Sequence, residues 1–341
     1  MATIRFALIG TGNIATTYAR AIPQARGAEL TAVVSRSTDR AASFIAEHGL
    51  AAVAGDGLAA IADGIDAVAV ATPSGLHAQA ACAAAGLGKH VLVDKPLDVR
   101  PAPMDEAIAA CDQAGCRLGV CYQRRARALN RALKELFDAE AFGRILAVDG
   151  SFRFYRDQAY YDSAAWRGTR ALDGGGPFMQ QASHDIDLLC WWLGRPRSVV
   201  AQTGCLAHQD IEVEDHGAAV LELAGGGICS LVASTIAKPG YSPTVTVITE
   251  RGSFSLQNDA ISSWAIEGVP QPTAAASGSH NAAQSAAVKD CSDHVAMVED
   301  LVHAIGENRP PLADGRSARQ ATDVICAIYQ AATSGRRVVI A

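Results

Sequence analysis

The sequence predicts an α/β protein in which a doubly wound parallel sheet is followed by an α+β part with a large, mostly antiparallel sheet. The chain of 341 residues is long enough for two domains, at roughly 100–200 residues each. Short apolar runs alternate with helical patterns up to about Gln123, and strand-like runs then follow one another. We therefore predict a first domain over residues 1–123 and a second over 124–341, whose last helix could pack back on the first.

The first domain is predicted from five apolar runs and the helical patterns between them. The runs are short and continuous, which is typical of strands buried on both faces of a parallel sheet. They cover residues 4–9, 30–34, 67–71, 90–93 and 118–122. The helical patterns cover residues 15–21, 40–47, 78–85 and 104–114. This alternation indicates parallel strands joined by right-handed crossovers.

The second domain has a different pattern. A helical segment over 124–140, a strand over 145–155 and a loop rich in Tyr, Trp, Arg and Gly precede a helix over 177–193. Strands in succession predict an antiparallel sheet, and they cover residues 199–205, 216–223, 227–236, 244–250 and 253–257. Residues 268–289 are interpreted as a long surface loop, and helices over 293–305 and 317–334 follow.

Composition excludes several classes of protein. Hydrophobic residues make up 49% and charged residues 19% of the chain, so a buried core is expected rather than disorder. The net charge of −6 argues against a nucleic-acid partner. Neither a membrane-spanning run nor a signal peptide is visible, and the nine cysteines contain no CxxC pair. We expect a cytoplasmic protein with buried, reduced thiols.

A glycine motif follows the first predicted strand. It reads Gly10-Thr11-Gly12-Asn13-Ile14-Ala15, a G-x-G-x-x-A pattern that opens the first helix. In a dinucleotide site the first glycine allows the tight turn, the second lets the backbone approach the pyrophosphate, and the small third residue packs helix on strand. The alternative is an ordinary glycine-rich turn, which the strand–turn–helix context disfavours.

The end of the second strand favours NADP over NAD. Ser35, Arg36, Ser37 and Thr38 stand where an NAD site usually places a carboxylate for the ribose 2′-hydroxyl. Arginine and hydroxyl side chains suit a 2′-phosphate instead. Asp39 is interpreted as a residue of the first turn of the next helix.

Lys95 is the first candidate for proton chemistry. The chain has five lysines and 24 arginines, and Lys95 lies in Asp94-Lys95-Pro96, directly after a buried strand. An ammonium group can polarise a carbonyl or pass a proton, whereas arginine does not titrate usefully. The alternative is a solvated loop lysine.

His184 is the second candidate. Gln180, His184, Asp187 and Trp191 recur at helical spacing after the run Gly174-Gly175-Gly176, so they share one face of the predicted helix. A histidine on such a face can act as a general acid or base. The alternatives are a structural histidine and a metal site with Asp187, for which no third ligand is signalled. We predict no metal.

The ordered set of motifs resembles the Gfo/Idh/MocA family, named after glucose–fructose oxidoreductase and inositol dehydrogenase. The resemblance covers nearly the whole chain. It rests on the glycine motif and on Ala71-Thr72-Pro73-Ser74 with His77, Asp94-Lys95-Pro96, Tyr122-Gln123-Arg124-Arg125, Trp166-Arg167-Gly168-Thr169, the helix bearing His184, and Gly335-Arg336-Arg337-Val338.

The resemblance implies a Rossmann domain, a second domain whose open sheet mediates a homodimer or homotetramer, and hydride transfer between NAD(P) and a carbon of a sugar, sugar derivative or cyclitol. Lys95 would match the catalytic lysine and His184 the acid–base histidine. Lys95, Arg124, Gln180 and His184 are expected to contact the substrate. Cofactor contacts are expected from Gly10, Gly12, Asn13, Ile14, Ser35, Arg36, Ser37, Thr72, Pro73, His77, Asp94, Lys95, Trp166 and Arg167.

One position departs from the family pattern. Gln180 stands one turn before the histidine, where the family commonly has Asp or Asn. Glutamine can hydrogen-bond a hydroxyl but cannot share a proton. Two other functions stay open: a non-catalytic dinucleotide-sensing regulator, which would need neither Lys95 nor His184, and an NAD-dependent glycosidase of the same superfamily, whose usual Gly-His-Gly signature is absent.

Overall fold

The structure is a computed structural model that describes residues 2–273 and 290–340. The chain divides into two compact units. The first comprises Met1–Ala126 and Ala287–Arg319, and the second comprises Arg127–Ala286 and Gln320–Ala341. The division falls within α10 (Gly315–Ser334). The predicted linear domains differ from these units, because residues 124–126 and 287–319, which include the helix predicted over 293–305, belong to the first unit.

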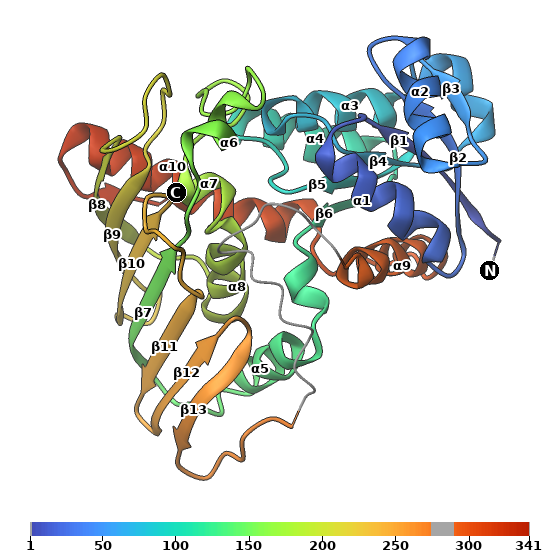
Figure 1. Ribbon diagram of the computed structural model, residues 1–341. Helices are drawn as coiled ribbons and strands as arrows, with labels where there is room; N and C mark the ends of the chain where they lie inside the picture. The colour runs from blue at the N-terminus through green and yellow to red at the C-terminus, as the bar shows by residue number, and fades with distance from the viewer. Residues whose placement is uncertain (1, 274–289, 341) are drawn as a thin grey trace. The chain divides into compact units, whose positions relative to one another are not determined.

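The first unit contains a six-stranded parallel sheet in the order β3-β2-β1-β4-β5-β6 (Figure 1). The strands are β1 (Ile4–Ile9), β2 (Ala28–Val34), β3 (Val53–Gly55), β4 (Ala67–Val70), β5 (His90–Asp94) and β6 (Leu118–Cys121). The helices are α1 (Asn13–Ala21), α2 (Thr38–His48), α3 (His77–Gly86), α4 (Pro101–Gln113) and α9 (Ser292–Gly306). The strand order reverses at β1, and ligands of such sheets bind beside that point.

Local sequence explains where the helices of this unit begin and end. The side chain of Ser37 accepts a hydrogen bond from the Arg40 N–H and caps α2, which ends at Gly49 with φ +61°. Pro101 occupies the first position of α4, where its missing N–H costs nothing. Core strand residues such as Leu8 and Val68 are fully buried. The predicted first-turn position of Asp39 in α2 is confirmed.

The second unit contains an eight-stranded sheet in the order β13-β12-β11-β7-β10-β9-β8-β14. The strands are β7 (Ile145–Arg153), β8 (Ser198–Gly204), β9 (His216–Glu222), β10 (Ile228–Ser234), β11 (Thr244–Thr249), β12 (Gly252–Gln257), β13 (Ala260–Ile266) and β14 (Val338–Val339). All pairs are antiparallel except β7 with β10. The predicted fold class, a parallel sheet followed by a mostly antiparallel one, is confirmed.

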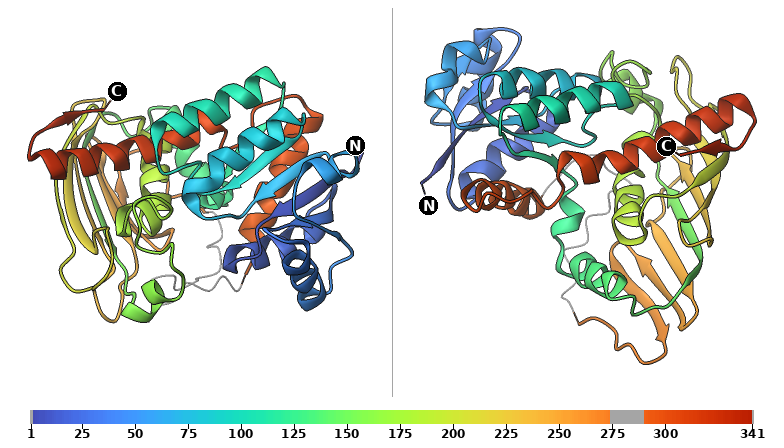
Figure 2. Two further views of the ribbon diagram at one scale, coloured as in Figure 1. Left: turned by 90° about the horizontal axis from the view of Figure 1, so that it is seen from above. Right: turned by 180° about the vertical axis from the view of Figure 1, so that it is seen from behind.

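Helices cover one face of this sheet. They include α5 (Ala128–Asp138), α7 (Pro177–Gln180) and α8 (Ser183–Leu193), which lie on the same side in both views of Figure 2. On the opposite face Val200, Val220 and Ile228 are 41%, 46% and 58% exposed. Val200 and Val220 are direct partners across β8 and β9. The sheet therefore presents apolar side chains that the described residues leave uncovered.

The structure corrects several details of the predicted elements. The helix predicted over 177–193 is interrupted between α7 and α8, where the Ala182 N–H bonds to the Pro177 carbonyl five residues back at 2.8 Å. Such a wide turn inside a helix often occurs at functional sites. The strands β3, β13 and β14 and the helix α6 (Gln158–Asp162) were not predicted. Within the described residues no helix is long and apolar enough to cross a membrane.

Candidate active site

The glycine turn lies where the strand order reverses. Gly10 has φ +114°, and a Cβ there would lie 2.4 Å from the Ala71 carbonyl oxygen. Its N–H donates to the Val34 carbonyl at 2.9 Å, so the turn is fixed between the ends of β2 and β4. Only glycine fits this backbone, because an L side chain would be strained and would clash with the backbone of Ala71, directly after β4.

Gly12 is explained differently. A Cβ on Gly12 would meet no described protein atom within 4 Å. Gly12 is the N-cap of α1, where no side chain caps the helix, and Asn13 beside it is exposed. Ala15 is fully buried, as the third position of the motif requires. The open helix N-terminus and the bare Gly12 backbone fit a pyrophosphate lying against them.

The loop after β4 supplies a second observation that fits a cofactor. The Thr72 hydroxyl oxygen is buried and has no hydrogen-bond partner among the described residues. A buried unsatisfied hydroxyl needs an explanation, and a ligand group is one. Pro73 beside it is half-buried. His77 is 1% exposed, and both of its ring nitrogens lie against backbone carbonyls.

The end of β2 carries the predicted hydroxyl and arginine residues at its surface. Arg36 and Ser37 are exposed, and Ser35 is half-buried, with its hydroxyl 3.4 Å from that of Thr11. The structure adds Arg40, which sequence reasoning missed. Its Nε donates to the Thr11 hydroxyl at 2.8 Å, which brings its guanidinium to the glycine turn. The signal was an arginine three residues after the Ser37 cap.

The segment Asp94-Lys95-Pro96 leaves β5 at the same edge. Lys95 is half-buried. The hydroxyl of Tyr18, from α1, donates to Asp94 Oδ1 at 3.1 Å. Burial, together with Cys121 and Asp94, raises the pKa of Tyr18, and burial raises the pKa of Cys121. The Tyr18 hydroxyl therefore holds the Asp94 side chain at the end of β5.

One group of possible metal ligands is found among the described residues. Asp94, Cys121 and His294 each offer one ligand atom, and these atoms lie within 4.8 Å of one another. The ring of His294 also stands edge-on to Tyr18, with centroids 5.6 Å apart. Cys121 and His294 are neighbours of Asp94, whose carboxylate already accepts a hydrogen bond from Tyr18. His184 and Asp187, considered above as an alternative metal pair, are not among these residues.

The register of the sheet brings several predicted residues of the first unit together. Ile9 is opposite both Val34 and Val70, and Asp94 is opposite Cys121. The loops that begin at Gly10, Ser35, Ala71, Lys95 and Tyr122 therefore leave one edge of the sheet. Arg124 follows in a short 3-10 turn, Gln123–Ala126, and is half-buried.

Predicted residues of the second unit lie on two segments. Trp166 and Arg167 occupy the loop after α6, where the Arg167 guanidinium carbon lies 4.3 Å from the ring centroid of Tyr160 and 4.8 Å from that of Trp166. This stacking is favourable and fixes the arginine. Arg167 Nε is buried and has no hydrogen-bond partner among the described residues.

Gln180 and His184 lie on either side of the break between α7 and α8. His184 is half-buried in the first turn of α8. The amide nitrogen of Gln180 donates to the Asp173 carbonyl. The prediction that both side chains lie on one uninterrupted helix face is wrong, because the wide turn at Gln181 and Ala182 separates them.

The glycine run before α7 is held by Glu214, a residue that sequence reasoning missed. Its carboxylate accepts hydrogen bonds from the N–H groups of Gly176 and Phe178, at 2.9 and 3.2 Å, and from the Tyr329 hydroxyl at 2.9 Å. A Cβ on Gly176 would lie 1.7 Å from the Glu214 carbonyl oxygen, and one on Gly175 would lie 2.0 Å from the Tyr329 hydroxyl. Close approach therefore explains these glycines. Burial raises the pKa of Glu214.

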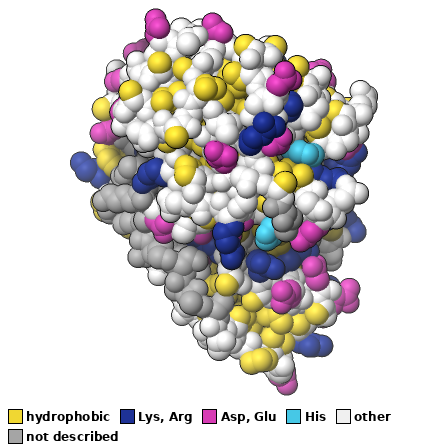
Figure 3. Space-filling model, turned by 90° about the vertical axis from the view of Figure 1, so that its right-hand side faces the viewer, with side chains coloured by type: hydrophobic (Ala, Val, Ile, Leu, Met, Phe, Trp, Pro, Cys, Tyr) yellow, Lys and Arg dark blue, Asp and Glu magenta, His cyan; other side chains and the backbone are white. Residues whose placement is uncertain are grey.

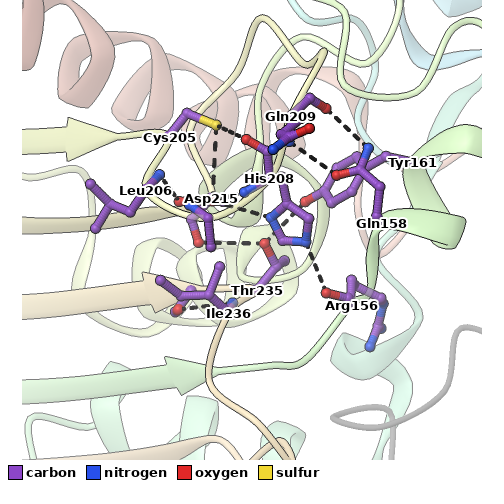
Figure 4. Close-up of polar contacts among 12 residues, drawn as sticks. Arg156, Gln158, Tyr161, Cys205, Leu206, His208, Gln209, Asp215, Thr235 and Ile236 are labelled. Carbon is purple, nitrogen blue, oxygen red and sulfur yellow. Dashed lines mark hydrogen bonds and ion pairs between the residues drawn. The ribbon is translucent and has the colours of Figure 1, made fainter.

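A polar cluster fixes the loop between β8 and β9 (Figure 4). Asp215 is fully buried and accepts hydrogen bonds from the backbone N–H groups of Leu206, Ala207 and His208, at 2.8 to 3.0 Å. Burial raises the pKa of Asp215, but these bonds and the His208 ring leave it below its ordinary value. Cys205 donates to the His208 carbonyl at 3.2 Å.

The cysteines are free, as expected, but not all are buried. Cys205 is exposed, and Cys82 and Cys326 are half-buried, so the prediction of buried thiols is wrong for these three. Charge on the visible surface is mixed. Acidic side chains lie among basic ones on the face seen in Figure 3, in keeping with the net charge of −6.

A six-stranded parallel sheet with this glycine turn, followed by a unit carrying a helix with a half-buried histidine, defines a nicotinamide-dinucleotide-dependent oxidoreductase. Comparison with known proteins agrees. Residues 4–122 match the oxidoreductase family model with an NAD-binding Rossmann fold, and residues 130–255 match the GFO/IDH/MocA C-terminal domain. The chain belongs to the GFO/IDH/MocA family of oxidoreductases.

Relatives of known activity and structure are similar over most of the chain. A D-xylose 1-dehydrogenase (NADP(+)) of Haloferax volcanii is 30% identical over 67% of this chain and 69% of its own. An inositol 2-dehydrogenase of Rhizobium meliloti is 26% identical over 75% and 76%. The WlbA dehydrogenase of Bordetella pertussis, solved with NADH and UDP-GlcNAcA, is 31% identical, covers 99% of each chain and has a TM-score of 0.87.

Proposed function

We propose that the protein transfers a hydride between NAD(P) and a carbinol or keto carbon of a sugar, sugar derivative or cyclitol. The observation that carries the proposal is the position of Lys95. Lys95 follows β5 and the Gly10–Gly12 turn follows β1, so both leave the same end of the parallel strands, with β4 between β1 and β5. The relatives reported above act on D-xylose and inositol, which are polyhydroxy compounds with a carbon of this kind.

Proton transfer is assigned to two side chains. Bound nicotinamide would accept or supply the hydride. When the substrate is oxidised, its hydroxyl must lose a proton as the carbon loses the hydride, and Lys95 and His184 are the groups that take it. Gln180, whose amide nitrogen donates to the Asp173 carbonyl, is assigned to orient the substrate hydroxyl.

The cofactor contacts follow from the elements described above. Gly10, Gly12, Asn13 and Ile14 would hold the pyrophosphate at the N-terminus of α1. Thr72 and Pro73 would contact the cofactor from the loop after β4. Asp94 and Lys95 would do so from the loop after β5. In the second unit Trp166 and Arg167 are assigned to the same role.

The cofactor preference is assigned to NADP. Arg36 and the hydroxyls of Ser35 and Ser37 stand at the end of β2, and Arg40 reaches the neighbouring Thr11. A guanidinium binds phosphate oxygens by charge-assisted hydrogen bonds, and a carboxylate at this place would repel the phosphate. The nearest acidic residue along the chain, Asp39, is in the first turn of α2.

We assign the sheet face with Val200, Val220 and Ile228 to a contact between copies of this chain, in a homodimer or homotetramer. Exposed apolar groups on a flat sheet favour association. Light scattering tests this, because Val220→Lys would lower the measured mass to that of one chain. A parent that is already monomeric would contradict it. The free cysteines support a reducing, cytoplasmic location.

A panel of pentoses, hexoses, uronic acids and cyclitols, followed by nicotinamide absorbance with both cofactors, tests the function. Turnover of a polyhydroxy substrate is expected. The second candidate is a dinucleotide-sensing regulator, which would bind cofactor tightly and turn over nothing in the panel. The presence of both Lys95 and His184 favours the enzyme.

A further inference from the structure

His77 has an unusual pair of neighbours. Its Nδ1 lies 2.6 Å from the Pro96 carbonyl oxygen, and its Nε2 lies 2.7 Å from the Thr72 carbonyl oxygen. The side chain is buried, at 1% exposure for the residue. A carbonyl oxygen can only accept a hydrogen bond, so both ring nitrogens must donate. A neutral imidazole carries one N–H and would leave a lone pair facing the other carbonyl.

We propose that His77 is a buried imidazolium that ties together the two cofactor loops and so positions Lys95. Thr72 lies in the loop after β4, and Pro96 directly follows Lys95. The ring thus fixes the backbone directly after Lys95. Tyr18 fixes the side chain of Asp94, directly before Lys95. This role rests on the proposed function of Lys95. His77 is then a positioning residue rather than a direct contact of the cofactor.

One set of charged groups near the His77 ring lies on the loop after β5. Asp98 is 1% exposed and accepts hydrogen bonds from the backbone N–H groups of Val99 and Arg100 and from that of Ala78 in α3. The Arg100 guanidinium lies 3.9 Å from Asp98. Burial raises the pKa of Asp98, and these hydrogen bonds oppose that change.

The N-terminus of α3, Lys95 and Arg100 oppose a charged ring, and Asp98 favours it. His77 is the first residue of α3, and the N-terminus of a helix disfavours a cation. A proton on Lys95, on the neighbouring loop, also opposes a charge on the ring. The Asp98 carboxylate, which accepts a hydrogen bond from the Ala78 N–H in the first turn of α3, favours the imidazolium. The two carbonyl oxygens decide the balance, because deprotonation would turn one hydrogen bond at under 3 Å into a repulsive contact.

Two other histidines provide references in the same chain. His90 Nδ1 accepts a hydrogen bond from the Arg117 N–H at 2.9 Å, so that nitrogen holds a lone pair and the ring is neutral. His208 repeats the pattern of His77 in the second unit (Figure 4). Its Nδ1 lies 3.1 Å from Asp215 Oδ2 and its Nε2 lies 3.0 Å from the Arg156 carbonyl oxygen.

Nitrogen NMR of the full chain, labelled at its histidines, tests the charge of the His77 ring without a substitution at that residue. Near pH 8.5, about two units above the ordinary histidine pKa of ~6.5, we expect two rings with both nitrogens protonated. His208→Asn should remove one of them and leave the other, which is His77. A spectrum of His208→Asn in which every ring is neutral would overturn the proposal.

Chemical rescue tests the positioning role. His77→Gly opens a cavity between the two carbonyls, and we expect kcat to fall roughly 10- to 100-fold, the scale of a small misplacement of a catalytic group. Added imidazole should restore the rate most at low pH, where it is cationic. Pyrazole, a ring of the same size that stays uncharged, should not. Equal rescue by both rings would show that only volume matters and would overturn the role.

The proposed function and the inference about His77 can be contradicted independently of each other. If Lys95→Met turns over at the parent rate while the NMR signature of His77 holds, Lys95 is not catalytic although the ring is charged. If Lys95→Met is inactive and His77 is neutral, the function stands and the inference about His77 falls. If the His77→Gly variant does not fold, the NMR of the parent and of His208→Asn still decides the charge.

Discussion

The buried hydroxyl of Tyr18 donates to the Asp94 carboxylate at 3.1 Å and so links the first helix to the residue before Lys95. Tyr18 is fully buried on α1, within two turns of the helix N-terminus at Gly12. The helix that would bind the pyrophosphate and the segment that carries Lys95 are therefore held by one hydrogen bond. A substitution at Tyr18 should therefore change the position of Lys95.

Tyr18→Phe removes this hydrogen bond while keeping the ring. We expect the free energy of unfolding to fall by about 0.5–1.5 kcal/mol, the net value of a typical hydrogen bond, and kcat to fall with little change in cofactor affinity. Urea unfolding and steady-state kinetics measure both. Tyr161→Phe, which removes the hydrogen bond to Thr235, is the matched control in the second unit. An unchanged kcat in Tyr18→Phe would mean that Asp94 is held without it.

His184→Ala tests the acid–base role of that histidine. We expect turnover to fall roughly 10²- to 10⁴-fold, the usual contribution of general acid–base catalysis, and the limb of the pH–rate profile near neutrality to disappear. Cofactor affinity should hardly change. His216→Ala, on the sheet of the same unit, is the control and should keep the parent profile. If His184→Ala keeps it too, the histidine is structural.

Arg36 and Arg40 test the cofactor preference together. A charge-assisted hydrogen bond contributes on the order of 1.5–3 kcal/mol, so Arg36→Ala should raise the NADP dissociation constant roughly ten- to a hundred-fold and the NAD value much less. Arg40→Ala should act in the same direction, because its side chain reaches the Thr11 hydroxyl beside the turn. Titration of both cofactors measures this. Equal losses for NAD and NADP in Arg36→Ala would show that Arg36 contacts adenine instead.

His90 gives a pH dependence of stability with a definite sign. Burial, and then Arg117, lower the pKa of His90 in the folded protein. The unfolded chain therefore binds a proton here that the folded chain does not, and the free energy of unfolding falls as the pH drops below about 6.5. His90→Asn offers an oxygen to the Arg117 N–H without titrating. Between about pH 7 and about pH 5 this variant should lose less stability in urea than the parent, and equal losses would contradict the assignment.

Much of the first unit could be predicted from the sequence because its signals are local. The parallel strands are continuous apolar runs, and the glycine turn requires its residue types at fixed spacing. Gly10 shows why, since its backbone conformation and its contact with Ala71 exclude a side chain. The short strands β3 and β14 have two or three residues, which is too few for a pattern to register.

The contacts that support the site could not be predicted, because they join residues far apart in the sequence. Glu214 lies 38 residues beyond Gly176, whose N–H it accepts. Tyr18 is 76 residues before Asp94. The interruption between α7 and α8 was missed for another reason. The apolar spacing continues across Gln181 and Ala182, so sequence periodicity does not distinguish a wide turn from regular helix.

Hydride transfer that depends on Lys95 is best measured by comparing the parent with Lys95→Met on the same panel of polyhydroxy substrates, with both cofactors present. The account predicts that the parent reduces or oxidises nicotinamide with at least one sugar or cyclitol. We expect Lys95→Met to lose turnover by roughly 10²-fold or more and to lose much less of its cofactor affinity, while Lys134→Met on the surface of α5 matches the parent. Turnover by Lys95→Met at the parent rate would contradict the account.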